Sequence, residues 1–199
     1  MRIKREDFDS TINLIKKTGT VTIAKNSLSF NSYLRVLFSM LLINKKSLLI
    51  HSSGLIVNDK AHIFIGKSGS GKTTIIRNSK EFQSLGDELI CISNIKGVFC
   101  SFSTPFGGEL PQIRRNLCFP LKSIYKIIKS GKPTIKKLSK HAAFTLLLKC
   151  AMNFSNNEDT ISKITKFISK IIKRIPLFEL QTTKTLSFKI VCIGEIPII

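Results

Sequence analysis

Hydrophobic and polar positions along the chain fall into two patterns. Short apolar runs bounded by polar or glycine residues predict strands, whereas apolar residues that recur at helical spacing predict helices. The predicted strands cover residues 47–51, 55–57, 61–65, 89–92, 97–102, 177–181 and 186–193. The predicted helices cover residues 31–43, 73–82, 121–129, 140–152 and 160–175. Because several strands are close enough in sequence to form hairpins, the pattern predicts an α/β fold with a mixed sheet flanked by helices.

Three of these segments allow more detailed expectations. Asn31 and Ser32 are suited to cap the first helix, whose broad apolar surface predicts that it is largely buried. The polar residues 58–60 predict a three-residue turn between two strands. In the last helix, Phe167 and several isoleucines lie opposite a row of lysines. This amphipathic pattern predicts packing on the sheet, and attachment to a membrane surface or to an acidic peptide stays open as an alternative.

No internal repeat and no linker rich in proline, glycine or serine interrupts the chain, which predicts a single domain over residues 1–199. Its chemically informative motifs lie within residues 48–109. Predicted helices and strands then fill residues 121–193. A homo-oligomer stays open at this stage.

The charge is strongly unbalanced: 32 lysines and arginines face 12 acidic residues, for a net charge of +20. This excess points to an anionic partner, such as a nucleotide or an acidic peptide, or reflects coding bias alone. With two tyrosines and no known reader motif, nucleic-acid binding is the weaker interpretation. The five cysteines form no Cys-x-x-Cys pair, and neither a signal sequence nor a transmembrane segment is evident, so we expect a cytoplasmic protein.

Residues 66–73, Gly-Lys-Ser-Gly-Ser-Gly-Lys-Thr, fit the P-loop pattern G-x-x-x-x-G-K-[ST] without a mismatch, between a predicted strand and a predicted helix. Glycines permit positive φ and remove side chains, so that backbone N–H groups converge on phosphate oxygens. Lys72 would reach the β- and γ-phosphates, and the Thr73 hydroxyl would ligate Mg²⁺. The predicted nucleotide-binding residues are Gly66, Ser68, Gly69, Ser70, Gly71, Lys72, Thr73 and Thr74.

An acidic pair, Asp87-Glu88, precedes a short apolar strand after the loop. Parallel sheet topology would place the end of such a strand beside the phosphate loop, and with it a carboxylate. There the carboxylate could hold Mg²⁺ or accept a proton from an attacking hydroxyl. The plain alternative is that the pair belongs to an ordinary turn.

The order of these motifs over residues 48–92 resembles the HPr kinase/phosphorylase family of the phosphoenolpyruvate carboxykinase-like P-loop superfamily. A strand ending in His51, a hairpin, the P-loop and then an acidic pair follow one another at the spacing that this family uses. The resemblance implies ATP and Mg²⁺, with Lys72, Asp87 and His51 in catalysis and Asp87 as the base for the substrate hydroxyl. It also implies that Thr73, Asp87 and Glu88 surround the metal.

Residues 103–109, Ser-Thr-Pro-Phe-Gly-Gly-Glu, are similar to a segment of short superfamily members that accompany ribosomal-peptide modification clusters. On this resemblance Glu109 is a further candidate for metal or substrate binding; a tight turn between strands is the alternative. Arg77, Arg114 and Arg115 are the arginines near these motifs that could stabilise a transition state.

Three functions follow from these observations. The first is an ATP-dependent kinase that transfers the γ-phosphoryl group to a Ser or Thr hydroxyl of a peptide or protein, the acceptor being acidic if the basic charge has a role. The second is a non-catalytic module that binds a nucleotide for regulation, and the third is a small-molecule kinase. They differ in whether phosphate is transferred and in the size of the molecule that receives it.

Overall fold

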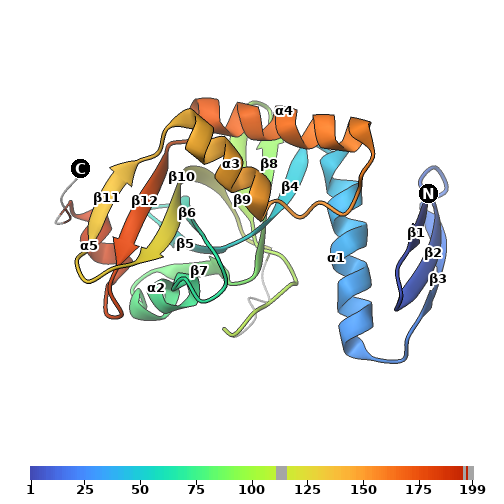
Figure 1. Ribbon diagram of the computed structural model, residues 1–199, viewed down its shortest axis with the longest axis horizontal. Helices are drawn as coiled ribbons and strands as arrows, with labels where there is room; N and C mark the ends of the chain where they lie inside the picture. The colour runs from blue at the N-terminus through green and yellow to red at the C-terminus, as the bar shows by residue number, and fades with distance from the viewer. Residues whose placement is uncertain (111–115, 195, 197–199) are drawn as a thin grey trace.

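A large mixed sheet occupies the centre of the protein in the computed structural model, which describes residues 1–110, 116–194 and 196 (Figure 1). The central strand β10 pairs in parallel with β6 and β12 and antiparallel with β9, while the other neighbours are antiparallel. The sheet is therefore mixed, as the sequence predicts. Its strands are β4 (Ser47–His51), β5 (Ser53–Val57), β6 (Lys60–Ile65), β7 (Gln83–Gly86), β8 (Leu89–Ile95), β9 (Val98–Phe102), β10 (Cys118–Lys129), β11 (Thr134–Lys137) and β12 (Leu177–Thr182).

Helices cover both faces of this sheet. On one face lie α3 (Lys140–Cys150) and α4 (Glu158–Arg174), which pack against each other above the strands (Figure 1). On the other face lie α2 (Lys72–Asn78) and the short α5 (Phe188–Cys192). Because successive residues of a strand point to opposite faces, Ile63 joins the core under α3 and α4, whereas Phe64 joins the core under α2 and α5.

The amphipathic helix α4 follows the prediction of an apolar face packed on the sheet. Ile164, Phe167, Ile168 and Ile171 are buried in the core, while the lysines lie on the opposite side. The Asn157 side chain caps its first turn, and acidic residues at its start and basic residues at its end both favour the helix dipole.

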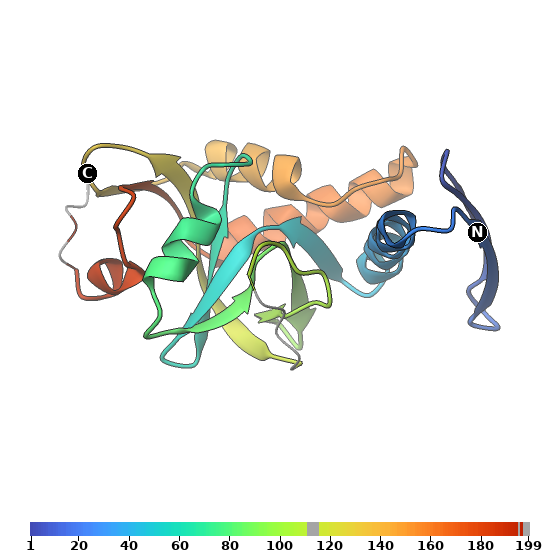
Figure 2. The ribbon, with the colours of Figure 1, turned by 90° about the horizontal axis from the view of Figure 1, so that it is seen from below.

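The N-terminal residues form a separate three-stranded antiparallel sheet for which the sequence analysis assigned no strands. Strands β1 (Arg2–Lys4), β2 (Phe8–Asn13) and β3 (Thr18–Ile23) make up this N-terminal sheet. Helix α1 (Ser27–Ile43) lies between it and the large sheet (Figures 1 and 2). The helix begins earlier than predicted, because Asn26, not Asn31 or Ser32, accepts the capping bond from Ser29 N–H.

The expectation that this first helix is largely buried holds for its predicted range, residues 31–43, where the large apolar residues other than Phe38 are buried or half-buried, but it fails for the first turn, which the sequence did not predict. Tyr33 and Val36 pack against Phe8 of the N-terminal sheet, but Leu28 is 80% exposed and Phe30 is 50% exposed. An apolar residue on a helix is buried only where a second element covers its face, and the N-terminal sheet covers one side of α1 alone.

The predicted helix at residues 121–129 is also wrong, because this segment is part of β10. The register between β10 and β6 shifts between Leu121 and Ser123, so Lys122 forms a bulge. The bulge places Leu121 and Ile124 in the same core although they are three residues apart, which is a helical spacing. A local distortion of the strand thus produces the pattern that indicates a helix.

Three other boundaries differ from the predictions. The predicted strand at residues 186–193 contains α5 instead, whose first turn is capped by Ser187. Helix α2 ends at Asn78, residues 79–82 form a turn, and β7 begins at Gln83. The turn between β5 and β6 has two residues, Asn58 and Asp59, both at positive φ, which is the turn geometry that matches the twist of a hairpin.

No helix within the described ranges is long and apolar enough to span a membrane.

His62 on β6 makes the stability of the fold depend on pH. Its ring lies beside Tyr125 and Phe188, and its Nδ1 is 3.0 Å from Ser123 Oγ. Burial, with smaller contributions from Lys122 and Lys60, lowers the pKa of His62 from 6.5 to about 4. Above pH 6.5 the ring is neutral in both states; as the pH falls towards 4, the unfolded chain binds a proton that the folded protein excludes. We therefore expect this histidine to cost about 3 kcal/mol of unfolding free energy by pH 4.

Urea unfolding followed by circular dichroism between pH 7 and pH 4 measures this loss. The His62→Phe variant should lose less stability over this range than the wild type. Replacing the exposed His141 by Phe is the matched control, and its pH dependence should remain that of the wild type. Equal pH slopes for all three proteins would contradict the assignment to His62.

Candidate functional site

The glycine loop, residues 66–73, connects the end of β6 to the start of α2. Three of its residues adopt backbone conformations that favour glycine: Gly66 at φ 159°, Gly69 at φ 71° and Gly71 at φ 105°. The ammonium group of Lys72 turns back into the loop, where it donates to the carbonyl oxygens of Gly66 at 3.0 Å and Lys67 at 3.1 Å. The strand, loop and helix thus occur in the order that the sequence predicts.

The interior of the loop has features of a cradle for an anion. A Cβ atom on Gly66 would lie 2.6 Å from Ser70 Oγ and 3.2 Å from the Ile127 carbonyl, so a larger residue would displace the loop. No described atom lies within 4 Å of a Cβ built on Gly69, which leaves that side open. The buried Ser70 Oγ finds no hydrogen-bond partner among the described residues. A buried hydroxyl without a partner is costly, and a phosphate oxygen in the loop could satisfy it.

Lys72 is the charged group of this cradle, and only 8% of it is exposed. Burial lowers the pKa of Lys72, while Cys150, Glu88 and Asp87 oppose this shift. Cys150, at the end of α3, lies close to the loop, although no sequence motif links the two. Burial raises the pKa of its thiol, and Lys72 opposes that rise.

Asp87 stands beside the loop, between β7 and β8. Its Oδ1 accepts hydrogen bonds from the hydroxyl groups of Thr73 at 3.0 Å and Ser53 at 3.2 Å. Its Oδ2 accepts from the backbone N–H of Leu110 at 3.0 Å. Three donors from three parts of the chain therefore hold the carboxylate against the first turn of α2, next to the residue predicted to ligate Mg²⁺.

Gly108 packs directly on this acidic pair. A Cβ atom at this position would lie 2.9 Å from the Asp87 carbonyl, 3.1 Å from Asp87 Oδ2 and 3.3 Å from Glu88 Oε2. The backbone carbonyl has little freedom to move, so a side chain here would displace the pair. The segment 103–109 thus contacts the site through its glycine, and the following residue, Leu110, through its backbone N–H.

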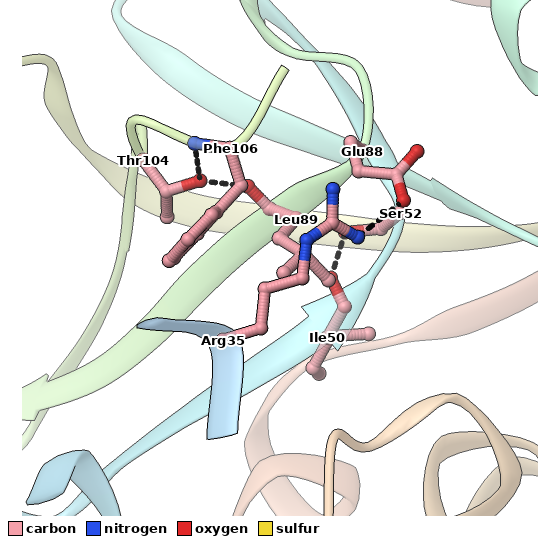
Figure 3. A network of polar contacts seen from close by, with 7 residues as sticks. All are labelled: Arg35, Ile50, Ser52, Glu88, Leu89, Thr104 and Phe106. Atoms are coloured by element: carbon pink, nitrogen blue, oxygen red, sulfur yellow. Dashed lines mark hydrogen bonds and ion pairs between the residues drawn. The ribbon is translucent and has the colours of Figure 1, made fainter. Parts of the chain in front are cut away.

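Glu88 forms an ion pair with Arg35, whose Nη1 lies 2.8 Å from Glu88 Oε1 (Figure 3). The guanidinium carbon is also 5.6 Å from the centre of the Phe106 ring. Phe106 is held by the loop in which Thr104 Oγ1 donates to the Leu89 carbonyl at 2.6 Å. Arg35 was missed by the sequence analysis, because it lies on α1, 53 residues from Glu88, and no local pattern links the two.

His51 ends β4, as predicted, and lies in the same electrostatic environment. Burial lowers the pKa of its ring, and the cations of Lys72 and Arg35 lower it further, whereas Glu88 and Asp87 raise it. The net shift is downward from 6.5, so the imidazole is neutral at pH 7. His51, Lys72 and the acidic pair, far apart in the sequence, are thus electrostatic neighbours in the fold.

Glu109 lies elsewhere. It forms an exposed ion pair with Arg77 of α2, with 2.9 Å between Arg77 Nη2 and Glu109 Oε2, and 71% of its side chain is accessible. Arg77, one of the arginines suggested for the transition state, is occupied by this contact. The other two, Arg114 and Arg115, lie outside the described residues.

The described residues contain no cluster of three or more His, Cys, Asp or Glu side chains able to hold a metal. Thr73 and Asp87 nevertheless bring two oxygen donors together, and Mg²⁺ commonly takes only one or two carboxylates and completes its shell with phosphate oxygens and water. The residues present therefore fit a magnesium ion that arrives with a nucleotide.

No protein-family model matches the sequence, and no curated protein matches it. Among solved structures, the chain is similar to the Hpr(Ser) kinase/phosphatase from Coxiella burnetii, with 10% sequence identity and a TM-score of 0.36. The match covers 59% of this chain and 87% of that one. A likeness this distant carries no argument about chemistry, so the interpretation of the site depends on the contacts described above.

Proposed function

We propose that the protein is an ATP-dependent kinase that transfers the γ-phosphoryl group to a Ser or Thr hydroxyl of a peptide or protein. The observation that carries this proposal is the 3.0 Å contact between Thr73 Oγ1 and Asp87 Oδ1. It sets a carboxylate beside the last residue of a loop that fits the P-loop pattern. A module that only binds a nucleotide would use this carboxylate for Mg²⁺ alone, whereas a kinase also uses it as a base, and the transfer assay below separates the two.

The glycine loop would hold the triphosphate. Its backbone N–H groups, the Ser70 hydroxyl and the Lys72 ammonium would bind the phosphate oxygens. Lys72 now donates to two backbone carbonyls, and phosphate oxygens would be stronger, charged acceptors for the same group. The residues predicted from the pattern, including Ser68 and Thr74 at its margins, keep this role in the proposal.

Thr73 and Asp87 would hold Mg²⁺, with Glu88 next to them. The ion would neutralise negative charge on the phosphates during transfer. Glu88 already has a counter-ion in Arg35 at 2.8 Å, so we assign it mainly to keeping Arg35 at the site. Arg35 thereby replaces Arg77 as the candidate cation near the transferred group.

Asp87 would act as the base. It accepts the proton of the acceptor hydroxyl while the hydroxyl oxygen forms a bond to the γ-phosphorus; the bond from that phosphorus to the bridging oxygen breaks, and ADP leaves. The neutral His51 would contribute a polar, uncharged group at the edge of the site. Its role follows from the resemblance to HPr kinases, and so does the assignment of a peptide or protein acceptor.

A transfer assay tests the proposal. The protein is incubated with Mg²⁺ and γ-³²P-labelled ATP, together with a pool of Ser- and Thr-containing peptides of acidic, neutral and basic composition or with a metabolite extract. We expect label in a peptide fraction, with acidic peptides preferred because of the net charge of +20. Label only in the metabolite fraction would indicate a small-molecule kinase, and binding of ATP without any transfer would indicate a regulatory module.

A further inference from the structure

The N-terminal sheet has a free edge at β3. Within the described part of the chain, β3 pairs with β2 alone, and all its residues but Ile23 are exposed. An uncovered edge strand offers a row of backbone N–H and C=O groups to a partner strand, and proteins usually block such edges with charges, proline or another element. Residues 18–23, Thr-Gly-Thr-Val-Thr-Ile, include neither a charged residue nor proline.

The hydrogen bonds of β2 identify which groups of β3 face outward. Ile12 N–H donates to the Met1 carbonyl at 2.8 Å, and the terminal ammonium donates to the Ile12 carbonyl, so the backbone of Ile12 faces β1. Gly19 lies opposite Ile12, and its own N–H and C=O therefore point away from β2. By the alternation along a strand, Val21 and Ile23 also direct their backbone groups to the free edge. Ala24, the next residue, points its backbone the other way, and its N–H donates to the Asp7 carbonyl at 3.0 Å.

A cavity of about 610 Å³ lies between α1 and the β2–β3 hairpin, and β3 contributes to its lining. Its wall includes four consecutive residues of β3, Thr18 to Val21, and therefore the strand backbone as well as its side chains. The opposite wall is formed by one face of α1, with Tyr33, Leu37 and Leu41. An added strand could bond to the β3 backbone and direct alternate side chains against the apolar helix face.

The charges around the cavity indicate which kind of chain would bind there. Lys17 and Lys45 line the cavity, and its described lining contains no acidic residue. The whole chain carries +20, so pairing two copies through this edge would bring like charges together, whereas an acidic segment would be attracted. A nearly uncharged strand between lysines thus suits an extended acidic chain.

We propose that the N-terminal sheet docks an extended acidic segment of a partner protein as an additional strand on β3, with its apolar side chains in the cavity against α1. This mode of recognition is called β-augmentation. Its affinity comes from hydrogen bonds between the backbones of the two strands, and its selectivity comes from alternate side chains that enter the cavity. It is separate from the proposed phosphoryl transfer and does not depend on it. A docking surface outside the glycine loop would let the protein select a partner by a segment remote from the reacting group.

The test uses the full chain and a fluorescent peptide of alternating valine and glutamate, about eight residues long, which matches the length of a strand. We expect saturable binding by fluorescence anisotropy that weakens as salt is added. The same peptide with alternate amides N-methylated keeps its charge and side chains but loses strand pairing, and it should bind at least about tenfold more weakly. A valine–lysine peptide should not bind.

The variant Val21→Pro tests the same backbone hydrogen bonds from the side of the protein. It removes an outward N–H without breaking a bond to β2, so the sheet should persist, as circular dichroism can check. We expect binding to fall at least about tenfold, while Val21→Ala, which keeps the N–H, should bind nearly as the wild type does. Equal affinity of the plain and N-methylated peptides for the wild type would overturn the proposal, and this comparison needs no variant to fold. A dimer in sedimentation that Val21→Pro dissociates would also overturn it, because the edge would then belong to a second copy.

Discussion

Replacing Asp87 by asparagine is expected to slow phosphoryl transfer by about a thousandfold, which is within the usual contribution of a general base. The amide oxygen can still accept from Thr73 and Ser53, so the loop keeps its neighbour, but the amide has no capacity to take the hydroxyl proton. Binding of ATP without Mg²⁺ should stay the same or tighten, because one negative charge near the phosphates is lost, whereas binding of ATP with Mg²⁺ should weaken, because the metal loses a carboxylate ligand. Initial rates with labelled ATP and calorimetric titration of ATP measure the two effects.

The control for this variant is Asp59→Asn, which removes one acidic charge in the exposed turn between β5 and β6. It should transfer phosphate at the wild-type rate. In Asp87→Asn the side-chain nitrogen replaces Oδ2 and faces the N–H of Leu110, so a thermal melt should accompany the rates. A folded Asp87→Asn protein that transfers phosphate at nearly the wild-type rate would remove Asp87 from the role of base.

Replacing Lys72 by methionine is expected to have opposite effects on nucleotide binding and on the stability of the free protein. The variant loses a charged donor to the phosphates, which corresponds to an about 10- to 100-fold weaker affinity for ATP. Without nucleotide, the buried ammonium of the wild type donates to two backbone carbonyls and to no other group among the described residues, and burial lowers its pKa. An apolar side chain of similar length avoids this desolvation, so the free variant should melt at a higher temperature.

Lys67→Met is the matched control, because Lys67 belongs to the same loop but is exposed. It should alter neither the affinity for ATP nor the melting temperature to a comparable degree. If both lysine variants weaken ATP binding equally, the loop attracts phosphate by general charge and Lys72 has no special place in it. If neither does, the glycine loop does not hold the triphosphate.

Local patterns identified most strands of the large sheet and most helices that pack on it. They failed where tertiary packing determines which secondary structure a segment adopts or how much of it is buried. The spacing of Leu121 and Ile124 indicated a helix, whereas a bulge at Lys122 creates the same spacing within a strand buried on both faces. The apolar residues of α1 indicated that the helix is largely buried, whereas its first turn, which the sequence did not predict, leaves Leu28 and Phe30 exposed. The periodicity of apolar residues indicates which side chains are buried, but it does not indicate which element covers them.

For the candidate site, the division is similar. The glycine loop and Asp87 were recognisable because each is a short contiguous motif with its own chemistry. Ser53 and the N–H of Leu110 were not, since they reach Asp87 from distant segments and a backbone donor has no signature in the side-chain sequence. Glu109 matched a motif, yet its side chain forms an exposed ion pair with Arg77.

The mixed α/β class, the position of the glycine loop between a strand and a helix, and the residues whose chemistry suits a phosphate could be predicted from the amino-acid sequence. Those properties are local, because they depend on glycine conformation, on apolar runs and on the order of neighbouring elements. The contact of Asp87 with Thr73, the ion pair of Arg35 with Glu88, and the edge of β3 that no described strand covers became evident in the folded chain. Contacts between distant segments arise from the packing of whole elements, and no short stretch of sequence encodes that packing alone.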